Sequence, residues 1–184
     1  MDGVQEAKLD QRGFGLVPST PGWFVVSLLD AYWETHAFGD ACFFENPDAP
    51  FEQLGFSVRV LWPGRSTWLY HAESAQEAFL VVAGEALLIV EDVERRLRAW
   101  DFVHCPARTR HAFVAIGRAP CVIVMAGSRP AQHSYRYPRS PIAVERGVAA
   151  TVETTAPEEA LSSFEPWTAI PAPSDGLPWA DPVE

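Results

Sequence analysis

The chain has 184 residues, is 48% hydrophobic and carries a formal net charge of −10 at pH 7. This length and composition suit one domain with a sizeable core and extensions at its ends. Because the charge is so negative, nucleic acid and anionic membrane surfaces are poor partners, and we expect the protein to bind neither.

No apolar run in the chain approaches the roughly 18 residues that a membrane span needs. The first ten residues, MDGVQEAKLD, lack the basic and apolar segments of a secretion signal. Cys42, Cys105 and Cys121 are an odd number of cysteines without CxxC spacing. We therefore predict reduced thiols and a cytoplasmic location, since disulfides are rare in that compartment.

The first part of the chain is expected to alternate between irregular segments and a strand. Residues 1–21 are polar and end in VPSTP, which indicates an extension. Residues 23–29, WFVVSLL, are rich in residues that favour β-structure and predict a strand. Residues 34–51 contain glycine, asparagine and proline at several positions, which predicts a long loop.

Residues 55–64, GFSVRVLWPG, alternate in polarity. Val58 and Val60 fall on one face and Arg59 on the other, which predicts a half-buried strand before a Pro-Gly turn. Further short strands are predicted at residues 66–72, 77–83, 86–91, 94–98, 101–105, 111–116 and 120–126. Many short strands without a long helix predict an all-β fold, either closed or made of two sheets.

The last third of the chain is proline-rich. One short helix is predicted within residues 142–165, with Thr155 as its N-cap and Pro157 in its first turn. The end of the chain is expected to be irregular. Trp167 and Trp179 nevertheless indicate that this end docks on another part of the protein.

Histidine and carboxylate side chains stand where neighbouring predicted strands begin. His71 and Glu73 share one face because strand side chains alternate. Glu77 follows a tight turn, and His111 follows the sequence PARTR. Four such donors can converge at one end of a barrel, and two imidazoles with one or two carboxylates suit iron(II), manganese, nickel or zinc. Without a cation the two carboxylates would repel, which would raise one of their pKa values.

The same residues resemble the two signature motifs of the cupin superfamily. The first motif is matched by Gly64, His71, Glu73, Glu77 and Gly84. The second motif is similar to WDFVHCPARTRHAFVA, residues 100–115, in which Pro106 precedes His111. The likeness covers about residues 55–127 and is greatest to small single-domain cupins.

This resemblance implies a cupin-like double-stranded β-helix, which is a jelly-roll barrel, with N- and C-terminal extensions. We expect an N-terminal extension at 1–21, the barrel at 22–127 and a proline-rich C-terminal extension at 128–184, packed on the barrel or on a partner subunit. The resemblance also implies one divalent transition metal (zinc, iron(II), nickel or manganese), and the ligands that it implies are His71, Glu73, Glu77 and His111.

A homodimer is a further implication of the resemblance, because small cupins pair their sheets or exchange terminal strands. The predicted strand at 23–29 and the aromatic residues near the C-terminus would supply the contacts. Dimers are also the commonest closed assembly.

The chain departs from the family motifs at several positions. Glu73 stands where the family has its second histidine, Trp100 and Arg108 replace glycines, and Ala115 replaces an asparagine. These departures bear on metal binding more than on the fold. Glu73 is either a fourth ligand or a hydrogen-bonding group beside the ligands. The alternative to a metal site is a metal-free barrel whose polar groups are hydrogen-bonded.

Three arginines and two aromatic residues near the predicted site each have two interpretations. Arg65, Arg108 and Arg110 would hold an anionic substrate through paired hydrogen bonds, or they lie in solvent. Trp68 and Phe113 line the cavity, or they belong to the ordinary core.

Two further pairs of residues are less informative. Alternation turns either His104 or Cys105 inward, and a buried cysteine is usually a small apolar residue. His36 and His133 fall in predicted loops, where the sequence identifies no partner for them.

Three functions remain open, because cupins include dioxygenases, isomerases, decarboxylases, sugar-binding regulators and storage proteins. The first is a metal-dependent enzyme, a dioxygenase, isomerase or related enzyme, on a small oxygenated or anionic substrate. In it Glu73 or Glu77 relays a proton when it is not a ligand. The second is a non-catalytic small-molecule-binding or sensory cupin, and the third is a structural dimer braced by its metal.

Overall fold

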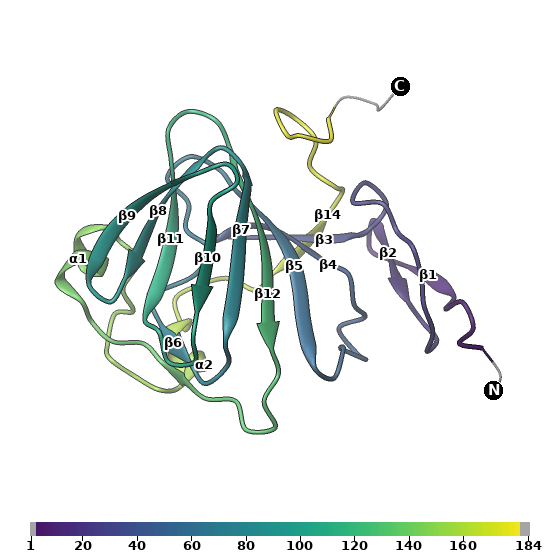
Figure 1. The fold of residues 1–184 in the computed structure, drawn as a ribbon, viewed down its shortest axis with the longest axis horizontal. Helices are drawn as coiled ribbons and strands as arrows, with labels where there is room; N and C mark the ends of the chain where they lie inside the picture. Colours follow the sequence, from purple (N-terminus) through teal and green to yellow (C-terminus); the bar gives the residue numbers. More distant parts are fainter. Residues whose placement is uncertain (1–2, 181–184) are drawn as a thin grey trace.

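Strands dominate the computed structural model, which describes residues 3–180 (Figure 1). The strands are β1 (Leu9–Arg12), β2 (Gly15–Pro18), β3 (Tyr32–His36), β4 (Gly39–Phe43), β5 (Leu54–Leu61), β6 (Ala72–Glu73), β7 (Glu77–Ala83), β8 (Glu85–Val90), β9 (Val93–Arg98), β10 (Phe102–Cys105), β11 (His111–Ile116), β12 (Cys121–Ser128), β13 (Tyr135–Arg136) and β14 (Thr168–Ile170). Two short helices, α1 (Pro141–Glu145) and α2 (Pro157–Ala160), follow β13. Neither has the length or apolar composition to cross a membrane.

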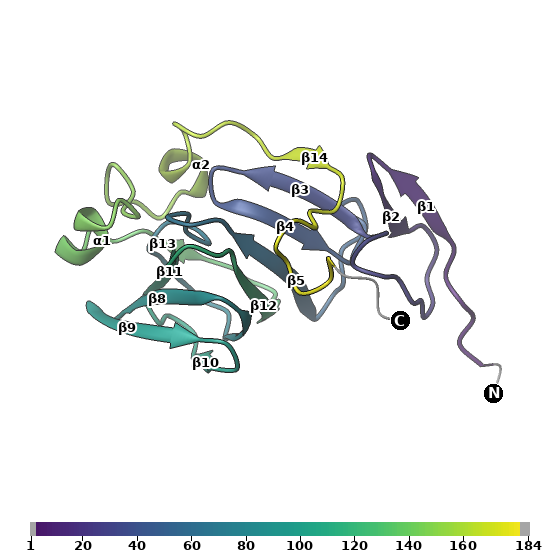
Figure 2. The ribbon, with the colours of Figure 1, turned by 90° about the horizontal axis from the view of Figure 1, so that it is seen from above.

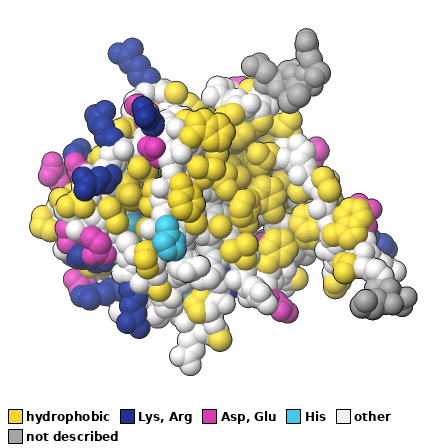
Figure 3. Space-filling view, in the orientation of Figure 1, with side chains coloured by type: hydrophobic (Ala, Val, Ile, Leu, Met, Phe, Trp, Pro, Cys, Tyr) yellow, Lys and Arg dark blue, Asp and Glu magenta, His cyan; other side chains and the backbone are white. Residues whose placement is uncertain are grey.

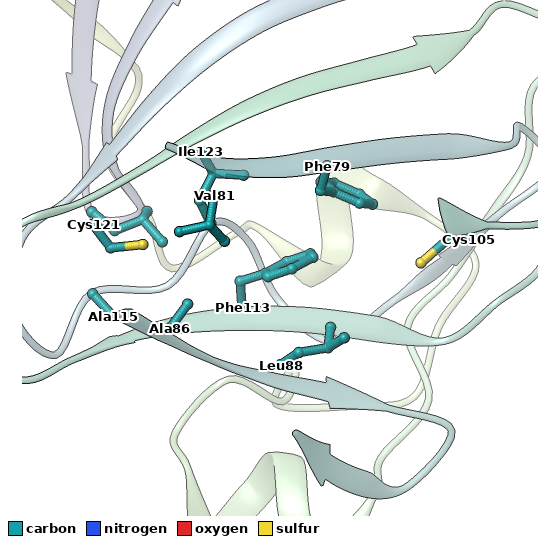
Figure 4. Close-up of a cluster of buried hydrophobic side chains, with 10 residues drawn as sticks. Phe79, Val81, Ala86, Leu88, Cys105, Phe113, Ala115, Cys121 and Ile123 are labelled. Carbon is teal, nitrogen blue, oxygen red and sulfur yellow. The ribbon is translucent and has the colours of Figure 1, made fainter. Parts of the chain in front are cut away.

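Two antiparallel sheets enclose the core. The larger has the strand order β10-β7-β12-β5-β4-β3-β14, and the smaller has the order β11-β8-β9. Between them the inward side chains form the interior cluster of Leu61, Phe79, Val81, Ala86, Leu88, Cys105, Phe113, Ala115, Cys121 and Ile123 (Figure 4). This arrangement confirms the predicted all-β jelly roll, and it places the polar starts of β7 and β11 beyond one end of the apolar cluster.

The strands predicted between residues 77 and 126 are all observed, with ends shifted by a few residues. The predicted strand at 66–72 is irregular instead, although it follows β11 through isolated bridges at Ser66 and His71. The ladder is interrupted because the register shifts between the Ser66–Val114 and His71–His111 bridges, which are separated by five positions on one segment and three on the other.

The prediction for residues 23–51 is wrong in two places. Residues 23–29 form no strand, because the chain turns there and the amide of Ala31 donates to the carbonyl of Ser27 at 2.9 Å. The predicted loop at 34–51 contains a hairpin of β3 and β4, which joins the large sheet beside β5. Its turn residue Gly39 has a φ of +89°, so the glycine marks a tight hairpin rather than a long loop.

Residues 1–21 also contain more structure than expected, because β1 and β2 pair as a hairpin. This hairpin projects from the side of the molecule away from α1 (Figures 1 and 2). The proposed boundaries of the extensions, at 21 and 127, stay predictions.

The C-terminal segment docks on the outer face of the large sheet, as its tryptophans predicted. The rings of Trp33 and Trp179 have centroids 5.9 Å apart, and Leu177 is buried in the same cluster. The segment is not wholly irregular, because β14 pairs with β3 (Figure 2). The predicted N-cap is also wrong: Ala156 occupies the N-cap position of α2, directly before Pro157, and its side chain makes no capping hydrogen bond.

Two of the residues that replace motif glycines adopt glycine-like backbone angles. Trp100 has a φ of +76° and Arg108 a φ of +73°. A left-handed conformation costs an L-residue roughly 1–2 kcal/mol. Trp100 is 75% exposed, so burial of its side chain offsets little of this conformational cost.

We therefore expect the free energy of unfolding of Trp100→Gly to be about 0.5–1 kcal/mol higher than that of Trp100→Ala. This difference allows for the greater chain entropy that glycine has in the unfolded state. Urea unfolding of the two variants measures this difference. Trp100→Ala is the matched control, because it removes the same ring and keeps the Cβ atom. Equal stability of the two variants would show that the backbone at this corner is not strained.

Candidate metal centre

His71 and His111 lie directly opposite each other. The amide of each donates to the carbonyl of the other, at 3.1 Å and 2.8 Å, in an isolated antiparallel bridge. Directly opposed residues point to the same side of a sheet, so the two rings meet with centroids 4.9 Å apart. The bridge therefore fixes both imidazoles at the start of β11.

Backbone carbonyls determine which ring nitrogen of each histidine is free. His71 Nδ1 lies 2.8 Å from the carbonyl oxygen of Leu69, and His111 Nδ1 lies 3.0 Å from that of Thr109. A carbonyl only accepts hydrogen bonds, so each Nδ1 carries the proton. Both Nε2 atoms are consequently left with a lone pair, which is the form that binds metals.

Glu77 completes a group of three possible ligands. It is the first residue of β7, and its Oε2 atom lies 3.2 Å from His111 Nε2. One ligand atom from each of His71, Glu77 and His111 lies within 4.8 Å of the other two. Across the ladder Glu77 faces Gly127 of β12.

Burial controls the charges of this group. It lowers the pKa of His71 to about 3, with a smaller contribution from the charge of His111. Burial also lowers the pKa of His111, so both imidazoles are neutral at physiological pH. Burial and then the charge of Glu73 raise the pKa of Glu77, so this carboxylate holds a proton when no cation is near.

These three residues fit a divalent transition metal. Two neutral imidazoles with oriented Nε2 lone pairs and one carboxylate are the donor set that iron(II), zinc, nickel and manganese accept. Glu77 keeps its proton because no positive charge among the described residues lies near its carboxylate. A bound cation would supply that charge and displace the proton. His71, Glu77 and His111 would hold the metal. The proposal that Glu73 is a fourth ligand stays a prediction.

Glu73 lies beside this group rather than within it. Its Oε2 atom is 2.8 Å from His133 Nε2, and its charge contributes to the raised pKa of Glu77. The backbone brings His133 there, because β13 pairs with β6 and places Tyr135 opposite Glu73. The sequence had identified no partner for His133, and this pairing supplies one.

A cavity of about 250 Å³ adjoins the three possible ligands. Trp68 and Met125 line it from the barrel, while Tyr135 and Tyr137 line it from the C-terminal extension. Arg59, on β5, also lines it. The C-terminal extension therefore closes one side of the site, which the sequence did not indicate beyond predicting that this extension docks.

The three arginines proposed as anion ligands lie elsewhere. Arg110 is paired with Glu91 and Asp92, at 2.6 Å and 2.9 Å. Arg108 and Arg110 line a separate hollow, and Arg65 is exposed. None of the three is among the described residues that line the cavity.

The other residues considered from the sequence lie in the core, on the wall of the cavity or at the surface. Phe113 is fully buried in the interior cluster, while Trp68 lines the cavity. Cys105 points inward and His104 is exposed, as alternation allowed. Burial raises the pKa of the Cys105 thiol to about 12, which makes it a poor nucleophile. His36 lies in β3 and stacks on Trp167, with ring centroids 4.7 Å apart.

The sequence analysis missed Arg59 as a member of the site. Alternation correctly places Arg59 on the other face of the strand from Val58 and Val60. For a half-buried strand, however, it predicts that the face of Arg59 is the polar side. Both faces of β5 are covered, because the C-terminal segment packs on the Val58 side and the pairing of Arg59 with Ile123 turns the other side toward the interior cluster. The face of Arg59 is consequently the interior of the barrel.

The fold and the site define a double-sheet β-protein with a candidate metal centre at one end of its barrel. Residues 57–127 match the family model of the cupin domain, and this segment of the chain is a cupin domain. No curated protein matches the sequence of the chain.

Two solved structures are similar in fold. A sugar phosphate isomerase of the cupin superfamily from Silicibacter pomeroyi is 20% identical, with 78% of this chain and 91% of that one covered and a TM-score of 0.56. The polyketide cyclase RemF from Streptomyces resistomycificus is 14% identical, with 59% and 82% covered and a TM-score of 0.51. At these identities the comparisons show the fold alone.

Proposed function

We propose that this cupin is a metal-dependent enzyme that acts on a small oxygenated or anionic substrate inside the barrel. The observation that carries the proposal is the group of His71, Glu77 and His111 at the wall of a cavity of about 250 Å³. Three protein ligands leave coordination positions for a substrate. A divalent metal bound there would supply Lewis-acid polarisation of a substrate oxygen.

Glu73 and Glu77 are the proposed proton-handling residues. Glu73 takes this role while Glu77 is a metal ligand, because Glu73 Oε2 lies 2.8 Å from His133 Nε2. The ring of Tyr135 stacks on His133 with centroids 4.6 Å apart and keeps that imidazole beside Glu73. This chain of side chains can take a proton from a substrate carbon or oxygen and pass it toward the surface, where His133 is partly exposed.

The similar structures support a small-molecule reaction in the barrel without identifying it. One is named a sugar phosphate isomerase and the other a polyketide cyclase. Isomerase chemistry agrees with a metal beside a proton relay, so we favour it over dioxygenase chemistry. The cytoplasmic location stays a proposal, supported by three cysteines that are all free and buried.

Metal removal separates this proposal from the two alternatives. Chelated and metal-reloaded protein are compared for turnover of sugar phosphates and small hydroxy and keto acids, and for their thermal midpoints. An enzyme loses turnover on chelation, regains it on reloading and stays folded, because its interior cluster does not include the ligands. Saturable binding without turnover would indicate a binding module, and a collapse of the midpoint would indicate a structural metal.

We also propose that the protein forms a homodimer through the outer face of its large sheet. One row of directly paired residues on this face is apolar across all seven strands: Phe102, Leu80, Val124, Val58, Cys42, Trp33 and Ile170. The C-terminal segment covers Trp33, whereas Phe102 is 65% exposed. In the orientation of Figure 1, hydrophobic side chains form a broad patch over the middle of the molecule, and charges gather at one end (Figure 3).

A second copy of the chain suits the uncovered part of this row, because a flat apolar face is self-complementary about a twofold axis. The terminal strand first expected at the interface, at 23–29, does not exist, and the C-terminal tryptophans pack on their own sheet. The sheet face therefore replaces both as the proposed contact.

We expect light scattering to give the dimer mass for the wild type at micromolar concentration and the monomer mass for Phe102→Glu. The substitution places like charges close to each other across a twofold contact, which costs several kcal/mol. Val93→Glu is the control, because Val93 is an exposed apolar residue on the small sheet. A monomeric wild type, or a dimeric Phe102→Glu variant, would contradict the proposed contact.

A further inference from the structure

Arg59 faces the interior of the barrel from the middle of the large sheet. Its direct neighbours across the ladder are Ile123 on β12 and Ala41 on β4. Ile123 belongs to the interior cluster, and directly paired residues share a face. Arg59 therefore points inward, and it lines the same cavity as His71 and His111.

Two aromatic rings hold the guanidinium of Arg59 in place. Its Cζ atom lies 5.3 Å from the centroid of Phe43 and 4.8 Å from that of Trp167. Phe43 ends β4, whereas Trp167 comes from the segment between α2 and β14, which runs beside β3 (Figure 2). Contacts with ring faces fix the plane of a guanidinium and leave its N–H groups unused.

Two of the three guanidinium nitrogens of Arg59, Nε and Nη1, are buried without a hydrogen-bond partner in the described part of the chain. No ion pair among residues 3–180 includes Arg59. Burial lowers its pKa to about 10, and the charge of Glu34 opposes this effect only in part. Buried guanidinium nitrogens without an acceptor are costly, so their position beside a cavity points to a ligand that accepts hydrogen bonds from them.

We propose that Arg59 binds the carboxylate or phosphate group of a small acid whose other end reaches His71, Glu77 and His111. This inference rests on the proposed function and narrows its substrate class to small acids. The planar guanidinium matches either oxyanion through paired hydrogen bonds. Arg59 and a divalent metal would both place positive charge on the wall of this cavity, which favours a ligand with an oxyanion over a neutral one.

The size of the cavity agrees with this class. Its volume of about 250 Å³ equals the share of roughly eight water molecules in the liquid, which suits a small acid rather than an oligosaccharide or a peptide. Arg59 is also the arginine that lines this cavity, whereas Arg65, Arg108 and Arg110 lie outside it.

Calorimetric titration of metal-free protein with inorganic phosphate and with malonate tests the role of Arg59 separately from the metal. We expect Arg59→Met to weaken the binding of at least one of the two anions by about tenfold to a hundredfold, as the loss of charge-assisted hydrogen bonds predicts. Arg59→Lys keeps the charge without the planar donor group and should lose less affinity. Arg65→Met is the matched control and should bind like the wild type.

Thermal unfolding distinguishes an anion-binding residue from a structural one. Arg59→Met removes an unpaired buried charge and keeps contact with both rings, so its midpoint should not fall below that of the wild type. The anion that loses more affinity identifies the substrate as a phosphate or a carboxylic acid. Affinities for both anions within twofold of the wild type would overturn the inference. The metal content of the wild type is measured separately by elemental analysis. If the wild type binds no metal, only the proposed function is overturned.

Discussion

Replacing both His71 and His111 with alanine is expected to reduce bound transition metal from about one atom per chain to a trace, in protein purified without chelators. The two imidazoles supply two of the three candidate ligands, and the carboxylate of Glu77 alone cannot retain a transition metal against water. Elemental analysis of the purified proteins measures the effect.

His104→Ala is the control for this experiment, because His104 is exposed on β10 and turned away from the interior. Its metal content should equal that of the wild type. The double variant should remain folded, since neither histidine belongs to the interior cluster, and circular dichroism checks this. Equal metal content in the double variant and the wild type would show that any metal binds elsewhere.

The affinity for metal is expected to rise with pH, by about tenfold per unit while Glu77 carries its proton. The sign follows from the three pKa shifts. The pKa values of His71 and His111 are lowered, so these rings are already neutral and release no proton. The pKa of Glu77 is raised, so metal binding must displace its proton, and this becomes easier as the pH increases.

Titration calorimetry in buffers of different ionisation enthalpy counts the protons released, and we expect about one per metal near neutral pH. Glu73→Gln is the matched variant, because it removes the neighbouring charge that raises the pKa of Glu77. Its pH dependence should keep the same slope and move to lower pH. Glu77→Gln should bind weakly and without this slope. A wild-type affinity that does not change with pH would contradict the assigned proton.

The sequence predicted the part of the site that depends on short-range geometry. The alternation of strand residues and the two motifs placed His71, Glu77 and His111 at neighbouring strand starts, and the structure brings these three together. The strands of the barrel between residues 77 and 126 were predicted for the same reason, since each is set by local alternation and by the turns beside it.

The rest of the site depends on contacts between distant parts of the chain. His133 reaches Glu73 because β13 pairs with β6, and no local pattern in HSYRYPR specifies that pairing. Arg59 lies inward because β5 pairs with β12 and places it opposite Ile123 of the interior cluster. Trp167 reaches Arg59 across more than a hundred residues of sequence.

The errors near the N-terminus have a similar cause. WFVVSLL has the composition of a strand, but Val25 is 80% exposed because no neighbouring strand accepts this segment. The glycine and prolines at 34–51 marked turns correctly, while the strands on either side of Gly39 show no alternation of buried and exposed residues.

A crystal structure of the metal-loaded protein, with anomalous diffraction recorded on both sides of the absorption edge of the metal, tests the central claim most directly. We expect one anomalous peak per chain, at about 2.0–2.3 Å from the Nε2 atoms of His71 and His111 and from a carboxylate oxygen of Glu77. A peak at another group of residues, or none in crystals of protein shown to contain metal, would contradict the assignment of this site.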